Sequence, residues 1–249
     1  MTGTIRAELL KLFSIRTTWA LIAASAAMGL LVLAGLPPPQ EHATGAALLL
    51  ELFVAASITS PLVLALGTLL VGGEFHHKTI SQTLLVTPNR GRLLVAKLLV
   101  GAAGGLALST ACLLVALSVG LPALAGRGVT IGMLDQRAVL GLVGSLAANA
   151  LWAMLGVGLG AVLRSQVAAI VAALVFNFAV DPVLQGIAPR LWRYLPAAAD
   201  QGLTKRPFSF AAITSMPPLG RVASLGVFLA WAGAATLAAE LLLRQRDVT

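Results

Sequence analysis

Charged side chains are scarce in this sequence. They make up 10% of its 249 residues, whereas a soluble globular domain carries about 25%. Hydrophobic residues account for 58%, and the mean hydropathy is +0.94. So few charges cannot cover the surface of a soluble domain of this length with polar groups. The composition therefore excludes an ordinary soluble protein and predicts an all-α chain whose apolar surface faces a lipid bilayer.

Cysteine and the common catalytic motifs are lacking as well. The single cysteine, Cys112, lies inside an apolar run and excludes an internal disulfide. No G-x-x-x-x-G-K-[ST], H-E-x-x-H or G-x-S-x-G pattern occurs, so the sequence has no motif for a nucleoside triphosphate, a catalytic zinc or a serine nucleophile. His76 and His77 are adjacent and would point about 100° apart on a helix. We expect no metal site, no cofactor in this chain and no enzymatic activity.

The formal net charge is nevertheless +8. The basic residues stand at the ends of apolar runs, so membrane topology explains them better than nucleic-acid binding does. Each helical span needs about 20 apolar residues. The sequence predicts about six spans in one domain covering residues 1–249, at residues 17–36, 48–73, 98–121, 138–163, 167–187 and 222–243.

The distribution of lysine and arginine predicts that both termini are cytoplasmic. The first outer loop contains neither residue type, whereas both collect near the N-terminus and between the second and third spans. We therefore expect a multi-pass protein of the plasma membrane.

Residues 4–16 predict an amphipathic helix that lies in the membrane interface before the first span. One face carries large apolar side chains, and the other faces carry polar ones. The apolar face comprises Ile5, Leu9, Leu12 and Phe13, and the polar faces comprise Arg6, Glu8, Lys11 and Ser14.

Small and polar residues inside the spans indicate helix contacts. Gly101 and Gly105 form one G-x-x-x-G pair and Gly156 and Gly160 another, which predicts close packing within the bundle or at a dimer seam. Buried polar side chains are costly in a membrane and are therefore candidates for function. Asn149 and Asn177 lie deepest, and either hydrogen bonds between helices or a substrate pathway would explain them.

The polar segment between the second and third spans predicts a short amphipathic helix at the cytoplasmic face. Phe75, Ile80 and Leu84 can form an apolar stripe, and Glu74 can pair with Lys78 at i, i+4. Such a helix is a rigid element that a partner protein could grip, although a loop helix without a partner would show the same periodicity.

This helix should end at Pro88, followed by a turn at residues 89–91. Arg92 and Lys97 would then anchor the third span at the inner interface. Near the other face, Arg190–Leu195, with Trp192 and Tyr194, predicts an interfacial or re-entrant short-helix segment between the fifth and sixth spans.

Three patches together resemble type-2 ABC transporter permeases, the drug and polysaccharide exporter class. The likeness is greatest to versions from actinobacteria, and it covers essentially the whole chain. The patches are Gly73-Glu74 with Lys78-Thr79-Ile80, Leu84-Leu85, Thr87-Pro88-Asn89-Arg90 and Ala96-Lys97; Arg6–Leu12 with Ile15–Trp19; and Tyr194-Leu195-Pro196.

The resemblance implies a partner and a mechanism. Permeases of this class bind separate ABC ATPase subunits, which hold ATP and magnesium, and pair with a second permease copy or a paralogue. The loop helix would be the coupling helix, seated in a groove of the ATPase. Its contact residues would be Glu74, Phe75, Lys78, Thr79, Ile80, Leu84, Pro88 and Arg90.

The expected function is therefore that of a permease subunit that exports an amphipathic or drug-like substrate. Two other classes stay open. One is a membrane protein that confers immunity by sequestering a toxic compound without transport. The other is a membrane-embedded enzyme, which would need clustered carboxylates or metal ligands that the sequence lacks.

Overall fold

The computed structural model describes residues 2–35, 50, 52–53, 56–76, 90–126, 136–205 and 216–245. Across these ranges the chain is helical and has no strand, which confirms the all-α prediction. The elements are α1 (Thr2–Ser14), α2 (Arg16–Gly35), the 3-10 helix η1 (Ala56–Thr59), α4 (Ser60–His76), α6 (Arg90–Gly126), α7 (Gln136–Leu163), α8 (Gln166–Val175), the π-helix η2 (Phe176–Val180), α9 (Asp181–Ile187), α10 (Pro189–Trp192), α11 (Pro196–Thr204) and α12 (Arg221–Gln245).

Among the described residues, five helices are long and apolar enough to cross a membrane. Helices α1 and α2 are bent by 70° against each other, and this pair is a sixth candidate if it counts as one span. The five are Ala56–Phe75, Gly91–Gly126, Gln136–Leu163, Gln166–Ile187 and Arg221–Leu242.

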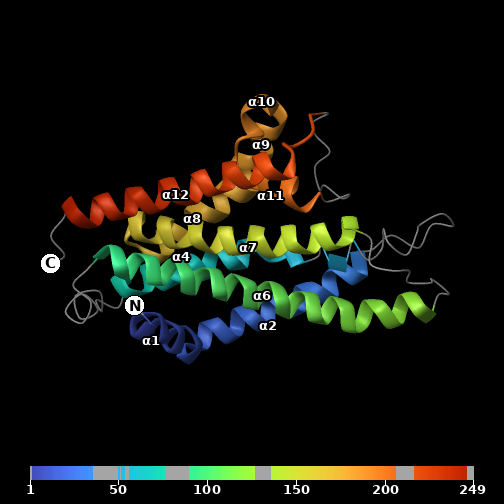
Figure 1. Ribbon diagram of the computed structural model, residues 1–249, viewed down its shortest axis with the longest axis horizontal. Coiled ribbons are helices and arrows are strands. Elements are labelled where there is room, and N and C mark those ends of the chain that lie inside the picture. The colour runs from blue at the N-terminus through green and yellow to red at the C-terminus, as the bar shows by residue number, and fades with distance from the viewer. Residues whose placement is uncertain are drawn as a thin grey trace.

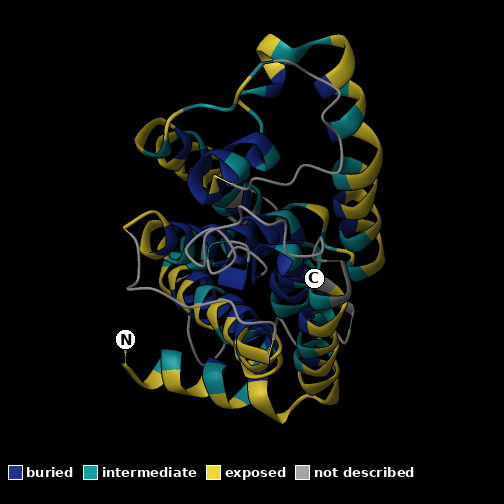
Figure 2. Ribbon diagram, turned by 90° about the vertical axis from the view of Figure 1, so that its right-hand side faces the viewer, coloured by how far each residue is buried: buried dark blue, intermediate teal, exposed yellow. Residues whose placement is uncertain are grey.

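Helix α7 forms the centre of the bundle. It packs against α4, α6, α11 and α12, while α2 lies along the outer side of α6 (Figure 1). Seen along the bundle, the helices turn buried faces towards one another and exposed faces outward (Figure 2). Trp152 of α7 meets Phe228 of α12 edge to face, with ring centroids 5.2 Å apart, and both side chains are fully buried. The core thus joins segments from both halves of the chain.

The four glycines of the two G-x-x-x-G pairs lie at helix contacts inside this chain. Gly101 and Gly105 of α6 face α7: a Cβ on Gly105 would stand 2.8 Å from the Asn149 carbonyl oxygen. Gly156 and Gly160 of α7 face α4, where a Cβ on Gly160 would stand 2.7 Å from the Thr68 carbonyl oxygen. Because no side chain intervenes, the backbones approach closely enough for dispersion contacts to hold the helices together.

The helix of the second predicted span ends later than hydropathy indicates. Helix α4 runs on to His76, so Glu74 and Phe75 belong to its last turns and do not begin a separate loop helix. The apolar run ends at Gly73, but a backbone helix continues through polar residues where these find partners. Residues 77–89, which hold the rest of the predicted coupling helix, lie outside the described residues.

The third span also begins earlier than expected. Helix α6 starts at Arg90 and not near residue 98, so the predicted turn is wrong for Arg90 and Gly91. Hydropathy places the boundary where charges appear, but the hydrogen-bonded helix extends two turns further. At the other end α6 continues to Gly126, with Pro122 inside the helix near that end.

The fifth predicted span is a single helical run with one widened turn. Helices α8 and α9 are joined by η2, in which the Asp181 N–H donates to the Phe176 carbonyl in the π pattern. Pro182 follows directly and occupies the first turn of α9, where a proline N–H is not needed. The π turn thus accommodates Pro182 without ending the helical run.

Candidate functional site

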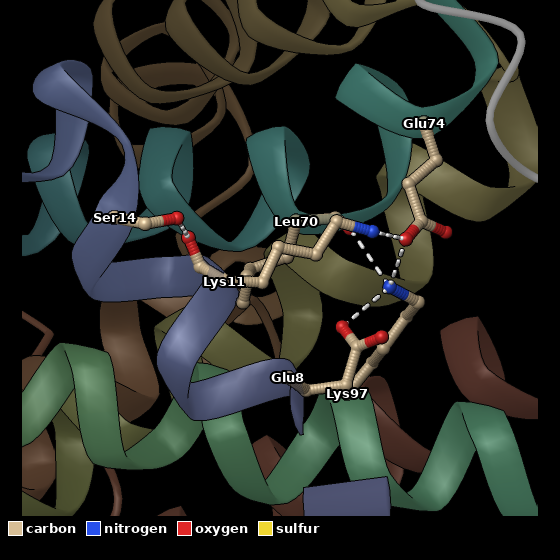
Figure 3. A network of polar contacts seen from close by, with 6 residues as sticks. All are labelled: Glu8, Lys11, Ser14, Leu70, Glu74 and Lys97. Atoms are coloured by element: carbon tan, nitrogen blue, oxygen red, sulfur yellow. Dashed lines mark hydrogen bonds and ion pairs between the residues drawn. The ribbon is translucent and has the colours of Figure 1, made fainter. Parts of the chain in front are cut away.

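Four charged side chains from three helices meet at one end of the bundle (Figure 3). Glu8 and Lys11 come from α1, Glu74 from the end of α4 and Lys97 from α6. Lys97 Nζ lies 2.7 Å from Glu8 Oε2 and 2.9 Å from Glu74 Oε1. Lys11 Nζ donates to the same Glu74 oxygen. We call these four residues the ion cluster.

The ion cluster is deeply buried and electrically balanced. The side chains of Lys97 and Glu74 are each 3% exposed and that of Glu8 is 6% exposed, whereas Lys11 is 40% exposed. Lys97 also donates to the Leu70 carbonyl oxygen at 3.2 Å, so each of its three N–H groups has an acceptor. Two carboxylates and two ammonium groups leave no net charge, which is the condition under which buried ions are tolerated.

Local sequence explains how α1 reaches this cluster. Glu8 and Leu12 are one helical turn apart and are both buried. Leu12 enters the main apolar core with residues of α4, α6 and α7, and this contact places Glu8 beside Lys97. Phe13, which the amphipathic pattern assigns to the apolar face, is 40% exposed on the protein surface, as an apolar side chain that faces lipid would be. The predicted separation of Glu8 from the apolar face is wrong, because Glu8 is buried with Leu12 and an ion partner on another helix replaces water.

Two further expectations concern charge pairing. Glu74 pairs with Lys97 and Lys11. Its predicted i, i+4 pairing with Lys78 stays a prediction, because Lys78 lies outside the described residues. Lys97 does not anchor α6 at the membrane interface, because its ammonium group is enclosed by carboxylates. Sequence spacing detects partners on the same helix, and these partners are on different helices.

Most of the predicted ATPase contacts cannot be placed. Lys78, Thr79, Ile80, Leu84 and Pro88 lie outside the described residues, and Arg90 is the first residue of α6. Phe75 is half-buried, and the guanidinium carbon of Arg164 lies 5.6 Å from the centroid of its ring. The described part of the predicted coupling segment is therefore its base.

Among the described residues, no hydrogen bond joins Asn149 to Asn177. Asn149 is fully buried in α7, and its Nδ2 donates to the carbonyl oxygens of Ala56 (2.9 Å) and Ser145 (3.1 Å). Asn177 is half-buried in η2. Asn149 thus joins η1 to α7. This favours hydrogen bonding between helices over a place on a substrate pathway as the explanation of Asn149.

Two buried carboxylate–indole pairs were not predicted from the sequence. Trp192 Nε1 donates to Asp181 Oδ1 at 3.1 Å, and Trp152 Nε1 donates to Asp200 Oδ2 at 3.3 Å. The first pair joins α10 to α9, and the second joins α11 to α7. Trp192 is 1% exposed, so its predicted place among interfacial anchors is wrong. No sequence signal pairs these residues, since Trp152 and Asp200 are 48 positions apart.

The described residues contain no group of three or more His, Cys, Asp or Glu side chains that could hold a metal ion. No model of a known protein family matches the chain. No curated protein matches its sequence. The ion cluster is accordingly the candidate site that the geometry itself provides.

Proposed function

We infer that this chain is the membrane-spanning permease subunit of an ATP-driven exporter, working with a separate ABC ATPase. In this proposal it crosses the plasma membrane six times, with α1 and α2 contributing the first crossing and its interfacial elbow. A second permease copy or paralogue completes the transport path. The support is the three-patch sequence resemblance together with the position of the ion cluster.

The observation that carries the proposal is the ion pair at the base of residues 77–89. Glu74 stands three residues before this segment and Lys97 stands eight residues after it, and their side chains are 2.9 Å apart. Through Lys11 and Glu8, helix α1 joins the same base. A force applied to the segment would therefore move α4, α6 and α1 together, as a coupling element requires.

Charge supports the proposed orientation. One end of the bundle holds α1, the end of α4, the start of α6 and the end of α12 (Figure 1). Basic residues on these elements, at the start of α2 and at the turn between α7 and α8 favour the cytoplasmic side. They include Arg6, Lys11, Arg16, Arg92, Lys97 and Arg164.

Energy conversion by such a subunit needs two conformations that the ATPase distinguishes. Nucleotide must bind one state of the complex better than the other, because a ligand shifts an equilibrium only by its difference in affinity. Closure of the ATPase would act on residues 77–89 and, through the ion cluster, on the bundle. A neutral cluster can move as a unit without leaving an uncompensated buried charge. The proposed cargo is an amphipathic or drug-like molecule.

The test is co-purification of an ATPase with the tagged chain from its native cells in mild detergent. Leu84→Asp places a charge in the predicted apolar stripe and should abolish capture of the ATPase. Leu191→Asp is the matched control, since Leu191 is exposed on α10, which we place at the outer face, and it should leave capture intact. Thermal unfolding of both variants checks that the fold is kept.

Absence of any ATPase from the wild-type sample would overturn the proposal. Equal loss of capture with both variants would also count against the assignment of residues 77–89 as the contact. In either case a protein that sequesters its target without transport becomes the better explanation.

A further inference from the structure

Phe75, the residue after Glu74, connects the base of residues 77–89 to a different set of helices. Neighbouring residues on a helix point about 100° apart. Glu74 therefore contacts α1 and α6, whereas Phe75 contacts the turn between α7 and α8. The guanidinium carbon of Arg164 lies 5.6 Å from the Phe75 ring centroid, within the range of a cation–π contact.

Arg164 is held in an unusual backbone conformation at this turn. Its φ is 51°, in the left-handed region, and its N–H donates to the Gly160 carbonyl oxygen at 3.1 Å. This geometry ends α7 and lets α8 begin at Gln166. A left-handed non-glycine residue is uncommon, and here it directs the arginine side chain towards α4 and α12.

The same side chain binds the end of α12. Arg164 Nη2 donates to the Leu242 carbonyl oxygen at 3.1 Å. Leu242 lies in the last turn of α12 (Arg221–Gln245), where carbonyl groups lack helical partners and a cation is favourable. One guanidinium therefore contacts an aromatic face on α4 and a helix terminus on α12.

Close packing surrounds this contact. A Cβ on Gly72 would stand 3.0 Å from Gln166 Cα, so the end of α4 lies directly against the start of α8. An apolar cluster joins α4, α6, α7 and α12 at this level. It comprises Val71, Leu94, Leu98, Val157, Ala161 and Ala239, with Phe75 packed against it.

We propose that Arg164 is a positioning residue that passes movement of the end of α4 to α12 and to the α7–α8 turn. This inference rests on the proposed function. In this proposal a movement of the end of α4 reaches two sets of helices. Glu74 passes it to α1 and α6, and Phe75 with Arg164 passes it to α8 and α12. Helices α8 and α12 bury less of their surface within the chain than α4 and α7 do. Fewer packing contacts hold them in place, so the Arg164 contacts at their ends contribute a larger share of what fixes their position.

Arginine is suited to this role for a specific reason. Its planar guanidinium can stack on an aromatic ring and donate hydrogen bonds from its edge at the same time. Lysine has a compact ammonium group, which can keep the charge near Leu242 but cannot also present a flat face to Phe75. We therefore expect Arg164→Lys to retain part of the function and Arg164→Gln to lose it.

The test follows two distances in the complex of the chain with its co-purified ATPase, reconstituted in nanodiscs. Spin labels at Leu241 and Val143 report α12 against α7, and labels at Leu10 and Val143 report α1 against α7; all three sites are exposed. Cys112 is buried and is replaced by alanine. Electron–electron resonance distances are measured without nucleotide and after trapping with ADP and vanadate.

In the wild type both distances should shift on trapping. In Arg164→Gln and in Phe75→Leu the α12 shift should be lost while the α1 shift stays, and Arg164→Lys should restore part of the α12 shift. Retention of the full α12 shift in both Arg164→Gln and Phe75→Leu would overturn the inference and leave the permease proposal standing. Loss of both shifts in these variants, with capture of the ATPase intact, would also overturn it, since a general loosening of the fold gives that result.

A wild-type sample that captures no ATPase would instead contradict the proposed function, and this inference with it. If Arg164→Gln fails to fold, Phe75→Leu decides, and its capture of the ATPase is measured alongside because Phe75 is also a predicted ATPase contact. Leucine keeps the apolar packing and removes only the aromatic face.

Discussion

Lys97 and Glu8 are 89 residues apart in the sequence and form a buried ion pair, with Lys97 Nζ 2.7 Å from Glu8 Oε2. The pair joins the first turns of α6 to the N-terminal helix, and Glu74 at the end of α4 shares the same ammonium group. Three helices that hydropathy treats as independent are thereby connected at one point. Glu74 and Lys97 flank residues 77–89, most of the segment that we propose couples to an ATPase.

Removal of Lys97 should strongly destabilise the protein. Lys97→Met leaves two carboxylates and only Lys11, so one buried negative charge is uncompensated, and such losses cost about 3–5 kcal/mol. Thermal unfolding in detergent measures the effect. Arg6→Met is the control, since Arg6 is exposed on α1 and its loss should change little. Adding Glu8→Gln to Lys97→Met restores neutrality, so the double variant should be more stable than Lys97→Met alone.

The two α1 residues of the cluster should contribute unequally. Glu8 has a side chain 6% exposed, whereas Lys11 is 40% exposed and partly solvated. Solvent already screens the partly exposed Lys11 ammonium group and can replace part of its interaction with Glu74, so Lys11→Gln should lower the free energy of unfolding less than the loss of a fully buried member of the cluster. Glu8→Gln should lower it more, because Lys97 loses a buried partner. Denaturation of the two variants side by side gives the order, and a larger effect at Lys11 would contradict the burial seen here.

Gly156→Ala should disrupt the contact between α7 and α4. The added Cβ would collide with the Leu64 carbonyl oxygen, and the Gly67 Cα would stand 3.1 Å away; both are backbone atoms of α4 and cannot rotate aside. We expect a clear drop in the unfolding temperature. Gly226→Ala is the matched control in α12, where nothing lies within 4 Å of the new Cβ. That change should be neutral or stabilising, since alanine favours a helix over glycine by about 1 kcal/mol.

Asn149→Leu should act on stability. It removes two hydrogen bonds to backbone carbonyls, and hydrogen bonds inside membrane bundles average roughly 0.6 kcal/mol, with a maximum near 1.7. The variant should unfold at a lower temperature, whereas Asn177→Leu in the half-buried η2 position should change it less. If Asn149→Leu left stability unchanged and altered resistance of the host to amphipathic drugs, a place on the substrate pathway would explain Asn149 better.

Much of the helix arrangement was readable from the sequence, and the boundaries were less so. Apolar runs of the length of a bilayer predicted helices at α2, α4, α6, α7, α8–α9 and α12, and each is present. The ends of α4 and α6 were misplaced because hydropathy stops at the first charges. The helix itself continues, since its backbone hydrogen bonds do not depend on side-chain polarity.

The helical class, the apolar surface and the positions of the charges follow from composition and from periodicity along one chain. Which charges meet depends on how the helices pack. Glu8 could have faced water and Lys97 the membrane interface, and no spacing rule links them across 89 residues. Their pairing arises because packing of Leu12 into the core places α1 against α6, and a buried charge then requires an opposite charge within reach.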